Sequence, residues 1–220
     1  GGGSGFENLV QASHAGVLDA DIVAVVSNHE HGCVRARAER LGIPFIYFPG
    51  PYDAEHYSNI LQNIGIEKSE LWVALSGWLK HVKGLDSQKT FNIHPALLSH
   101  PPAGGCGRFG GKGMYGMHIH EAVKAALDAG EISESGFTMH FVTDEYDRGP
   151  AFFEHRVPLH QGMSAEEIAK AVNAAEHEWQ PKITNMVVHG QIRWDGKNPK
   201  SLVVPKYYEF LPQLAAEVHY

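Results

Sequence analysis

A chain of 220 residues, 43% apolar and 20% charged, is long enough for one domain with a substantial core and is neither disordered nor fibrous in composition. The net charge of −7, with no dense run of lysine and arginine, argues against a protein that binds along a nucleic acid. No apolar run approaches the roughly 20 residues that cross a bilayer, and Cys33 and Cys106 lack CxxC spacing, so we expect a cytoplasmic protein with no nucleic-acid or membrane partner.

The chain opens with a glycine-rich segment, GGGSG, that runs into FENL. If this segment is a loop that leads into a helix, its free amides and the positive end of the helix dipole would attract a phosphate. A flexible linker is the alternative, and the segment alone favours neither. It matches neither the dinucleotide fingerprint nor the Walker loop, so the sequence does not support binding of a dinucleotide or a triphosphate.

Short apolar runs then alternate with amphipathic segments, which is typical of a βαβ arrangement with a mostly parallel sheet. The continuous apolar run Ile22–Val26 predicts a strand that is covered on both faces. The apolar stripe over 33–41 predicts a helix, which Gly42 and Pro44 end. The pattern repeats with a strand at 44–48, a helix at 57–64, and strands at 71–75 and 90–93.

The second half begins with a glycine- and proline-rich stretch over 99–116, which predicts a long irregular loop of the kind that often serves function. Alternation of Phe137, Met139 and Phe141 predicts a half-buried strand. Before this strand the sequence predicts a helix at 120–129, and after it an antiparallel strand at 150–159 and a short strand at 191–194. Between those two strands it predicts a helix at 164–189, which begins with a capping box formed by Ser164 and Glu167.

An amide and an imidazole stand two residues apart in FNIHPALL, where the strand at 90–93 ends. Asn92 and His94 therefore point to the same side, at the sheet edge where α/β proteins bind ligands. Asn can donate to a developing oxyanion, and His can exchange a proton near neutral pH. Taken alone, such a pair more often satisfies backbone groups at a strand end.

A carboxylate partner would make this pair a catalytic candidate, and the turn TDEYDRGP offers Asp144, Glu145 and Asp147. A carboxylate beside an imidazole fixes its tautomer and stabilises the imidazolium. We select Asp147, next to the glycine and proline of the turn. The alternative interpretation, acidic residues that solvate a turn, is common for an isolated motif.

Fifteen histidines raise the possibility of a metal site, with His29, His31 and Cys33 at alternate positions. Structural zinc spacing is absent, and we expect no bound metal.

Several collinear stretches resemble the phosphoribosylglycinamide formyltransferase family over almost the whole chain to about residue 194. They are GSGFENL, VVSN, LSGWLK, FNIHPALL, GMHIHEAV, GFTMHFVTDEYDRGP and AEHEW. The resemblance implies a three-layer Rossmann-like α/β fold with a mostly parallel sheet. It also implies transfer of a formyl group from 10-formyltetrahydrofolate to the amine of glycinamide ribonucleotide, in purine biosynthesis.

The resemblance implies a role for specific residues. Asn92, His94 and Asp147 match the family's catalytic trio, with a protonated His94 paired to Asp147 and no covalent intermediate. The substrate-binding positions implied are Ser4, Gly5, Phe6, Glu7, Asn8, Glu176 and His118, of which Ser4 to Asn8 would bind the phosphate. The folate-binding positions implied are Trp78, Leu79, Lys80, Val82, Asn92, His140, Val142, Thr143, Asp144 and Glu145.

The chain also departs from the family pattern. The glycine loop near the start is longer than usual, and HPPAGGCGRFGGKG is richer in glycine. The strand expected ahead of the glycine loop is missing, so we expect an empty position in the sheet and a chain that is part of a longer protein. We place a catalytic domain at 1–194 and a C-terminal extension at 195–220.

Two rival functions remain open at this point. A formyltetrahydrofolate deformylase shares the Asn, His and Asp arrangement and delivers the formyl group to water. A non-catalytic protein that binds folate or a nucleotide could use the same scaffold, although it would not need the trio. Methionyl-tRNA formyltransferase is disfavoured because a basic surface is lacking. The sequence does not distinguish a monomer from a homodimer.

Overall fold

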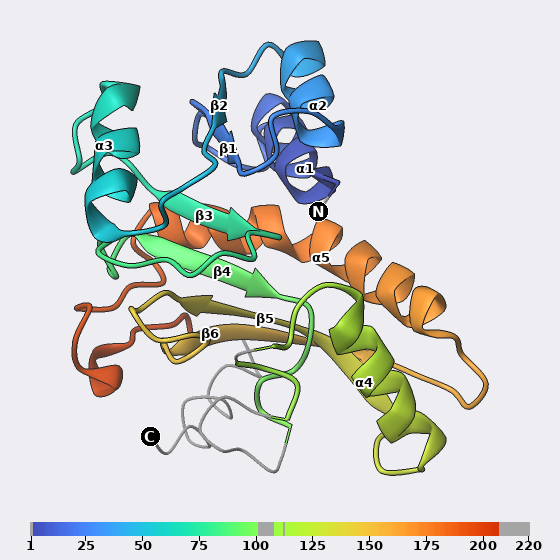
Figure 1. Cartoon of the computed structure of the whole chain (residues 1–220). Helices are drawn as coiled ribbons and strands as arrows, with labels where there is room; N and C mark the ends of the chain where they lie inside the picture. Colours follow the sequence, from blue (N-terminus) through green and yellow to red (C-terminus); the bar gives the residue numbers. More distant parts are fainter. Residues whose placement is uncertain (1, 101–107, 112, 207–220) are drawn as a thin grey trace.

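The computed structural model describes residues 2–100, 108–111 and 113–206, and Figure 1 shows the order of its elements. The helices are α1 (Ser4–His14), α2 (Cys33–Leu41), α3 (Ala54–Ile64), α4 (Met117–Asp128), α5 (Ala165–Val188) and a short 3-10 helix, Pro199–Ser201. The strands are β1 (Val25–Ser27), β2 (Phe45–Tyr47), β3 (Val73–Ser76), β4 (Thr90–His94), β5 (Glu134–Phe141) and β6 (Ala151–Pro158). None of the helices in the described part of the chain carries an apolar stretch of membrane-spanning length.

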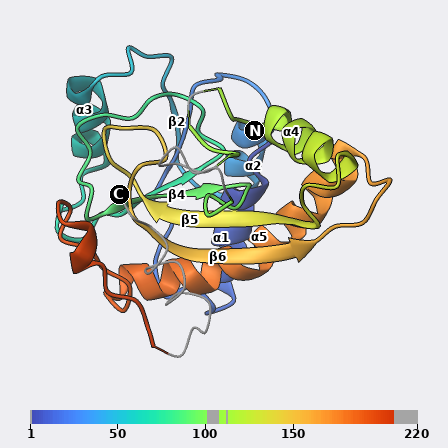
Figure 2. The same cartoon turned by 90° about the horizontal axis from the view of Figure 1, so that it is seen from below.

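The strands form two sheets, and the expected α/β class is confirmed. β1 pairs with β2 in parallel, and β3 pairs with β4 in parallel. The larger sheet continues through β5 and β6, which are both antiparallel to their neighbours, as predicted for the strand at 150–159. α5 packs against β5 and β6, and it also contacts α1 and α4. Figure 2 shows α5 running along one face of this sheet.

The expected empty position lies between the two sheets. No strand of the described residues pairs with both β1 and β3, and a cavity of about 490 Å³ is lined by residues of both strands. The strand predicted at Ile22–Val26 is therefore shorter than expected, Val25–Ser27, and it is half-buried along most of its length. Its expected burial on both faces was wrong, because one edge borders the cavity.

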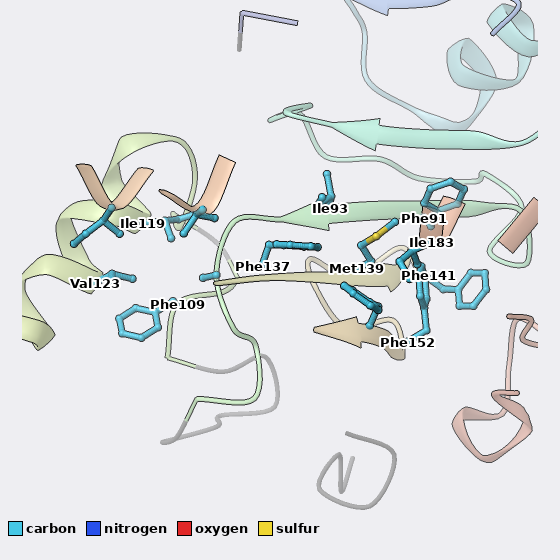
Figure 3. Close-up of a cluster of buried hydrophobic side chains, with 14 of the residues drawn as sticks. Phe91, Ile93, Phe109, Ile119, Val123, Phe137, Met139, Phe141, Phe152 and Ile183 are labelled. Carbon is cyan, nitrogen blue, oxygen red and sulfur yellow. The ribbon is translucent and has the colours of Figure 1, made fainter. Parts of the chain in front are cut away.

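The larger sheet has an apolar face that forms the main core, shown in Figure 3. Phe91 pairs with Phe141, and Ile93 pairs with Met139. Because residues two apart on a strand point to the same face, these four side chains lie together on one face of the sheet. The alternation predicted for β5 is confirmed, but the prediction that only one of its faces is buried was wrong, since nearly every residue of β5 is buried. The opposite face of β5 carries Thr138 and His140, which are buried in polar contacts instead.

Most helix boundaries follow the local signals. Gly42 ends α2 in the left-handed conformation, and Ser164 with Glu167 forms the predicted capping box of α5. α4 begins three residues earlier than predicted, after Gly116. The predicted strand at 191–194 was wrong, because the structure has only an isolated bridge between Arg193 and Val203. The loop predicted at 99–116 is irregular where it is described, and 101–107 and 112 lie outside the described residues.

Candidate active site

A cavity of about 770 Å³ lies at the carboxyl ends of β3 and β4, between the first residues of α1, the start of α4 and the middle of α5. This end of the parallel strands is where α/β sheets commonly bind ligands. The polar and aromatic residues around the cavity are Ser4, Ser76, Trp78, Asn92, His94, Tyr115, His120, Tyr146, Asp147, Asn173, Glu176 and Gln180. The cavity can therefore hold a ligand that is partly aromatic and partly polar.

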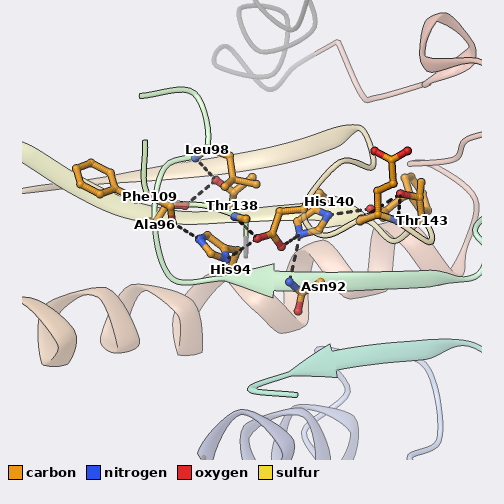
Figure 4. Close-up of polar contacts among 12 residues, drawn as sticks. Asn92, His94, Ala96, Leu98, Phe109, Thr138, His140 and Thr143 are labelled. Carbon is orange, nitrogen blue, oxygen red and sulfur yellow. Dashed lines mark hydrogen bonds and ion pairs between the residues drawn. The ribbon is translucent and has the colours of Figure 1, made fainter. Parts of the chain in front are cut away.

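The strand register places the predicted amide and imidazole on one face of the sheet. Asn92 lies opposite His140, and His94 lies opposite Thr138. As Figure 4 shows, Nδ2 of Asn92 contacts Nε2 of His140 at 3.1 Å. Nδ1 of His140 must donate to the carbonyl oxygen of Phe141, 2.8 Å away, because that oxygen can only accept. In the neutral ring Nε2 therefore accepts from Asn92, which fixes the orientation of the amide.

Asp147 reaches this face from the turn that follows β5. Its Oδ2 accepts a hydrogen bond from the backbone N–H of Gly111 at 2.8 Å and lies 3.8 Å from Nδ1 of His94. Its Oδ1 lies 3.5 Å from Nε2 of His140. The backbone of Asp147 has a φ of 51°, a left-handed conformation that is strained for a residue with a side chain. A side chain at Gly149 would collide with the carbonyl of Phe141, so this glycine allows the turn to fold against β5.

Burial and the neighbouring polar groups together set the protonation of His94 and Asp147. His94 is only 4% exposed, and Nε2 must donate to the carbonyl of Phe109 at 2.7 Å. Burial lowers the pKa of His94, although the charge of Asp147 opposes this shift. Burial also acts to raise the pKa of Asp147, but the contact with His140, the attraction to either imidazole when it is protonated and the Gly111 N–H outweigh burial and hold that pKa well below its usual range.

These directions describe the site before a substrate binds. The resemblance implies a protonated His94 paired with Asp147 during the reaction, and in the free site burial favours a neutral ring with its hydrogen on Nε2 beside an ionised Asp147. Nδ1 of His94 faces the carboxylate at 3.8 Å, beyond hydrogen-bond distance. A proton gained at Nδ1 would therefore be stabilised by a negative charge that is already in place.

Glu176 and the first residues of α1 occupy the other side of the cavity. Burial raises the pKa of Glu176 to about 7, and a hydrogen bond from Nδ2 of Asn173 at 3.1 Å opposes that shift. The backbone amides that begin α1 have no partners inside the helix and lie at its positive end. The implied substrate positions Ser4, Gly5 and Glu176 therefore border one cavity with the trio.

Other implied substrate positions lie elsewhere. α1 begins at Ser4, so Phe6, Glu7 and Asn8 are in a helix rather than in the expected loop. Phe6 is buried in an apolar cluster, Glu7 pairs with Arg37 and Arg40, and Asn8 donates to the carbonyl of His177. These contacts direct the three side chains away from the cavity lining.

His118 also lies outside the cavity lining. It pairs with Glu121 at the surface, whereas Ile119 and His120 face inward. His120 is a residue that the sequence interpretation missed. It is 6% exposed, lines the cavity, and its Nδ1 has no hydrogen-bond partner among the described residues. Helical periodicity could have identified it, since His120, Val123 and Leu127 share one buried face.

The implied folate positions form two groups. Trp78 and Leu79 line the cavity, and His140 does not line it but is hydrogen-bonded to Asn92, which does. The remaining positions do not line it but sit in two loops that touch, where His81 bonds the carbonyl of Asp144 and Asp144 accepts from the N–H of Gly84. These remaining positions are Lys80, Val82, Val142, Thr143, Asp144 and Glu145.

Among the described residues, no group of three or more His, Cys, Asp or Glu side chains is arranged to hold a metal ion.

The start of α1 packs tightly on the end of β3. A Cβ at Gly5 would lie 2.3 Å from Oγ of Ser76. We expect Gly5→Ala to destabilise the protein by about 2 kcal/mol in urea unfolding, because the added methyl group has no room. Gly2→Ala is the matched control, since a Cβ at Gly2 meets no atom within 4 Å. Equal stability of the two variants would contradict the close packing of α1 on β3.

Comparisons with known proteins show which sequences this chain is similar to. A family model described as formyl transferase matches residues 1–184. The chain is 34% identical over 200 residues to the chloroplastic phosphoribosylglycinamide formyltransferase of Vigna unguiculata, covering 88% of this chain and 60% of that protein. It is 27% identical over 204 residues to the Escherichia coli enzyme of that name, covering 88% and 86%. The chain spans less than two thirds of the length of this Vigna unguiculata protein and of the chloroplastic enzymes of the same name from Arabidopsis thaliana and Glycine max.

Solved structures are similar over most of their length. The phosphoribosylglycinamide formyltransferase of Anaplasma phagocytophilum is 26% identical with a TM-score of 0.72, covering 95% of this chain and 91% of that one. The enzyme of that name from Brucella melitensis is 30% identical with a TM-score of 0.67, covering 86% and 91%.

Proposed function

Since this chain belongs to the formyl transferase family, we propose that it transfers a formyl group from 10-formyltetrahydrofolate to the amine of glycinamide ribonucleotide, a step of purine biosynthesis. The observation that carries the proposal is the convergence of Asn92, His94 and Asp147 on one cavity, although Asp147 is distant from the other two in sequence. The names of these relatives support the same substrate, and a relative from Bos taurus named as a trifunctional purine biosynthetic protein supports the pathway.

The two substrates would enter the cavity from opposite sides. The phosphate of the ribonucleotide is attracted by the backbone amides at the start of α1, near Ser4 and Gly5. Glu176 then holds the glycinamide end, and its carboxylate accepts hydrogen bonds from the amine. The aromatic ring system of the folate packs against Trp78 and Leu79, and the loop at Asp144 borders that side. This arrangement brings the amine and the formyl group together above Asn92 and His94.

In the proposed reaction the amine nitrogen attacks the formyl carbon, and the carbonyl oxygen becomes an oxyanion. Asn92 has two N–H groups, of which the bond to His140 uses one, so the other can donate to the oxyanion and stabilise it by on the order of 3 kcal/mol. Nε2–H of His94 is already bound to the carbonyl of Phe109, so His94 takes part through the proton that its Nδ1 can gain beside Asp147. The bond from carbon to the folate nitrogen then breaks, that nitrogen gains a proton, and the attacking nitrogen loses one. Asp147 stabilises His94 while it carries a proton.

A formyl-transfer assay tests this function against its rivals. Purified protein is mixed with 10-formyltetrahydrofolate, with and without glycinamide ribonucleotide, and both formylated nucleotide and free formate are measured. We expect formylated nucleotide to form only when the ribonucleotide is present. Formate release that is independent of the nucleotide would instead indicate a deformylase, and ligand binding without either product would indicate a binding protein.

We also propose a cytoplasmic location, which the cysteine content supports, and a monomer or a homodimer. Some plant relatives are named as chloroplastic, so fractionation of the source cells is the direct test.

A further inference from the structure

Three residues on neighbouring strands form a row across the larger sheet. His94 of β4 lies opposite Thr138 of β5, and Thr138 lies opposite Glu154 of β6. Directly paired residues point to the same face, so the row leads from the candidate catalytic imidazole to a carboxylate two strands away. Thr138 is fully buried and Glu154 is 4% exposed.

Glu154 is held by hydrogen bonds rather than by a cation. Its Oε1 accepts from the N–H of Ser99 at 3.0 Å, and its Oε2 accepts from Oγ of Ser99 at 2.6 Å. Oγ1 of Thr138 lies 2.8 Å from Oε1 of Glu154. Among the described residues, no ion pair includes Glu154. A buried carboxylate destabilises a fold unless hydrogen bonds compensate its lost hydration, so this network must be satisfied as a unit.

Ser99, which bonds Glu154, and the residues that bond Thr138 all belong to the turn that directly follows His94. Oγ1 of Thr138 accepts from the N–H of Leu98 at 3.0 Å and lies 2.8 Å from the carbonyl of Ala96. Together with the two bonds from Ser99, these contacts tie residues 96–99 to β5 and β6. The turn therefore has little freedom to move relative to the sheet.

A backbone hydrogen bond links this turn to the segment that contacts His94 and Asp147. The N–H of Arg108 bonds the carbonyl of His100, the residue after Ser99. Beyond Arg108, the Phe109 carbonyl accepts from His94, and the N–H of Gly111 donates to Asp147. The turn that Glu154 anchors is thus joined by a backbone hydrogen bond to the segment that contacts both members of the proposed imidazole and carboxylate pair.

We propose that Glu154 is a positioning residue for the proposed formyl transfer: by holding Ser99 and, through Thr138, Ala96 and Leu98, it fixes the ring of His94 and the segment that contacts it. Glu154 does not line the cavity and touches no substrate. It acts through the backbone of residues 96–99, which follows His94, and through the segment 108–111, which contacts both His94 and Asp147. This inference rests on the proposed function only for its effect on catalysis, because its effect on the His94 ring is independent of any activity.

The test compares Glu154→Ala with the conservative Glu154→Gln. We expect Glu154→Ala to lower kcat by about 100-fold, because a displacement of reacting groups by about 1 Å has an effect of that size. The KM values of both substrates should stay within about threefold, since the cavity lining is unchanged. Glu154→Gln retains an oxygen acceptor for Ser99 and should stay within about tenfold of the parent kcat. The pH titration of the His94 ring, followed by NMR, should shift in Glu154→Ala and be restored in Glu154→Gln.

A matched control separates positioning from general loss of stability. Glu167→Ala deletes a carboxylate of the α5 capping box, remote from the cavity lining, and should lower stability by about 1 kcal/mol without changing kcat or the His94 titration. The proposal is overturned if Glu154→Ala leaves kcat and the titration unchanged, or if Glu167→Ala changes them equally.

A second variant covers the case in which Glu154→Ala does not fold. Ser99→Ala removes the Oγ donor and leaves Glu154 in place, and it should shift the His94 titration and lower kcat by several-fold. An unchanged titration in Ser99→Ala would then overturn the proposal. If the parent protein transfers no formyl group, the proposed function fails, and the His94 titration alone decides the role of Glu154.

Discussion

Replacing Asp147 by asparagine is expected to lower kcat by about 1000-fold and to leave the dissociation constant of the folate almost unchanged. The carboxylate is ionised in the free site and lies 3.8 Å from Nδ1 of His94 and 3.5 Å from Nε2 of His140. Asparagine has nearly the same shape but has no charge to stabilise a proton on His94 while the tetrahedral adduct forms and collapses. The folate is expected to bind at Trp78 and Leu79, which line the same cavity, and asparagine keeps the shape of the side chain at position 147.

Single-turnover kinetics and equilibrium folate binding measure the two parts of this prediction separately. Asp128→Asn is the control, because Asp128 pairs with Lys124 on the surface of α4 and should retain full activity. A kcat of Asp147→Asn within tenfold of the parent value would remove Asp147 from the mechanism. Loss of folate binding in the same variant would assign it to the folate pocket instead.

The sequence was sufficient to predict the relation between Asn92 and His94, because strand periodicity places residues two apart on one face. It was also sufficient to select Asp147, because Gly149 and Pro150 mark the turn that brings this carboxylate back to the sheet. Both are local signals. The contacts that complete the site come from the Phe109 carbonyl and the Gly111 N–H, and backbone groups of an irregular loop leave no pattern in a sequence.

Expectations that depended on an exact boundary were less successful. The loop expected to extend to Asn8 ends at Gly3, because Ser4 already begins α1, and Phe6, Glu7 and Asn8 then find partners in a helix. A shift of two residues likewise separates His118, at the surface, from His120, in the cavity. On a helix, two residues correspond to more than half a turn, so a small error of register moves a side chain to the other face.

The pH dependence of stability provides the second large effect, and it arises from Glu176. Its pKa in the folded protein is about 7, against an ordinary value of 4.5. Between these two values the folded state binds more protons than the unfolded state, so the free energy of unfolding falls as the pH rises. Above pH 7 the charge on this half-buried carboxylate destabilises the fold by up to about 3 kcal/mol in total. Glu176→Gln removes this charge, so it should be more stable than the parent by about that amount at pH 8 and by much less at pH 5.

Urea unfolding of both proteins at the two pH values measures this difference. Glu178→Gln is the control, because Glu178 lies on the exposed side of the same helix, and it should change the free energy of unfolding by less than about 0.5 kcal/mol at either pH. If the proposed function is correct, the gain in stability is accompanied by a loss of affinity for the ribonucleotide, because the neutral amide binds its amine end more weakly than a carboxylate does. A stability difference between Glu176→Gln and the parent that is the same at pH 5 and pH 8 would show that Glu176 ionises as freely as an exposed carboxyl. The position of Glu176 in the cavity would then not support its proposed role in binding the amine of the ribonucleotide.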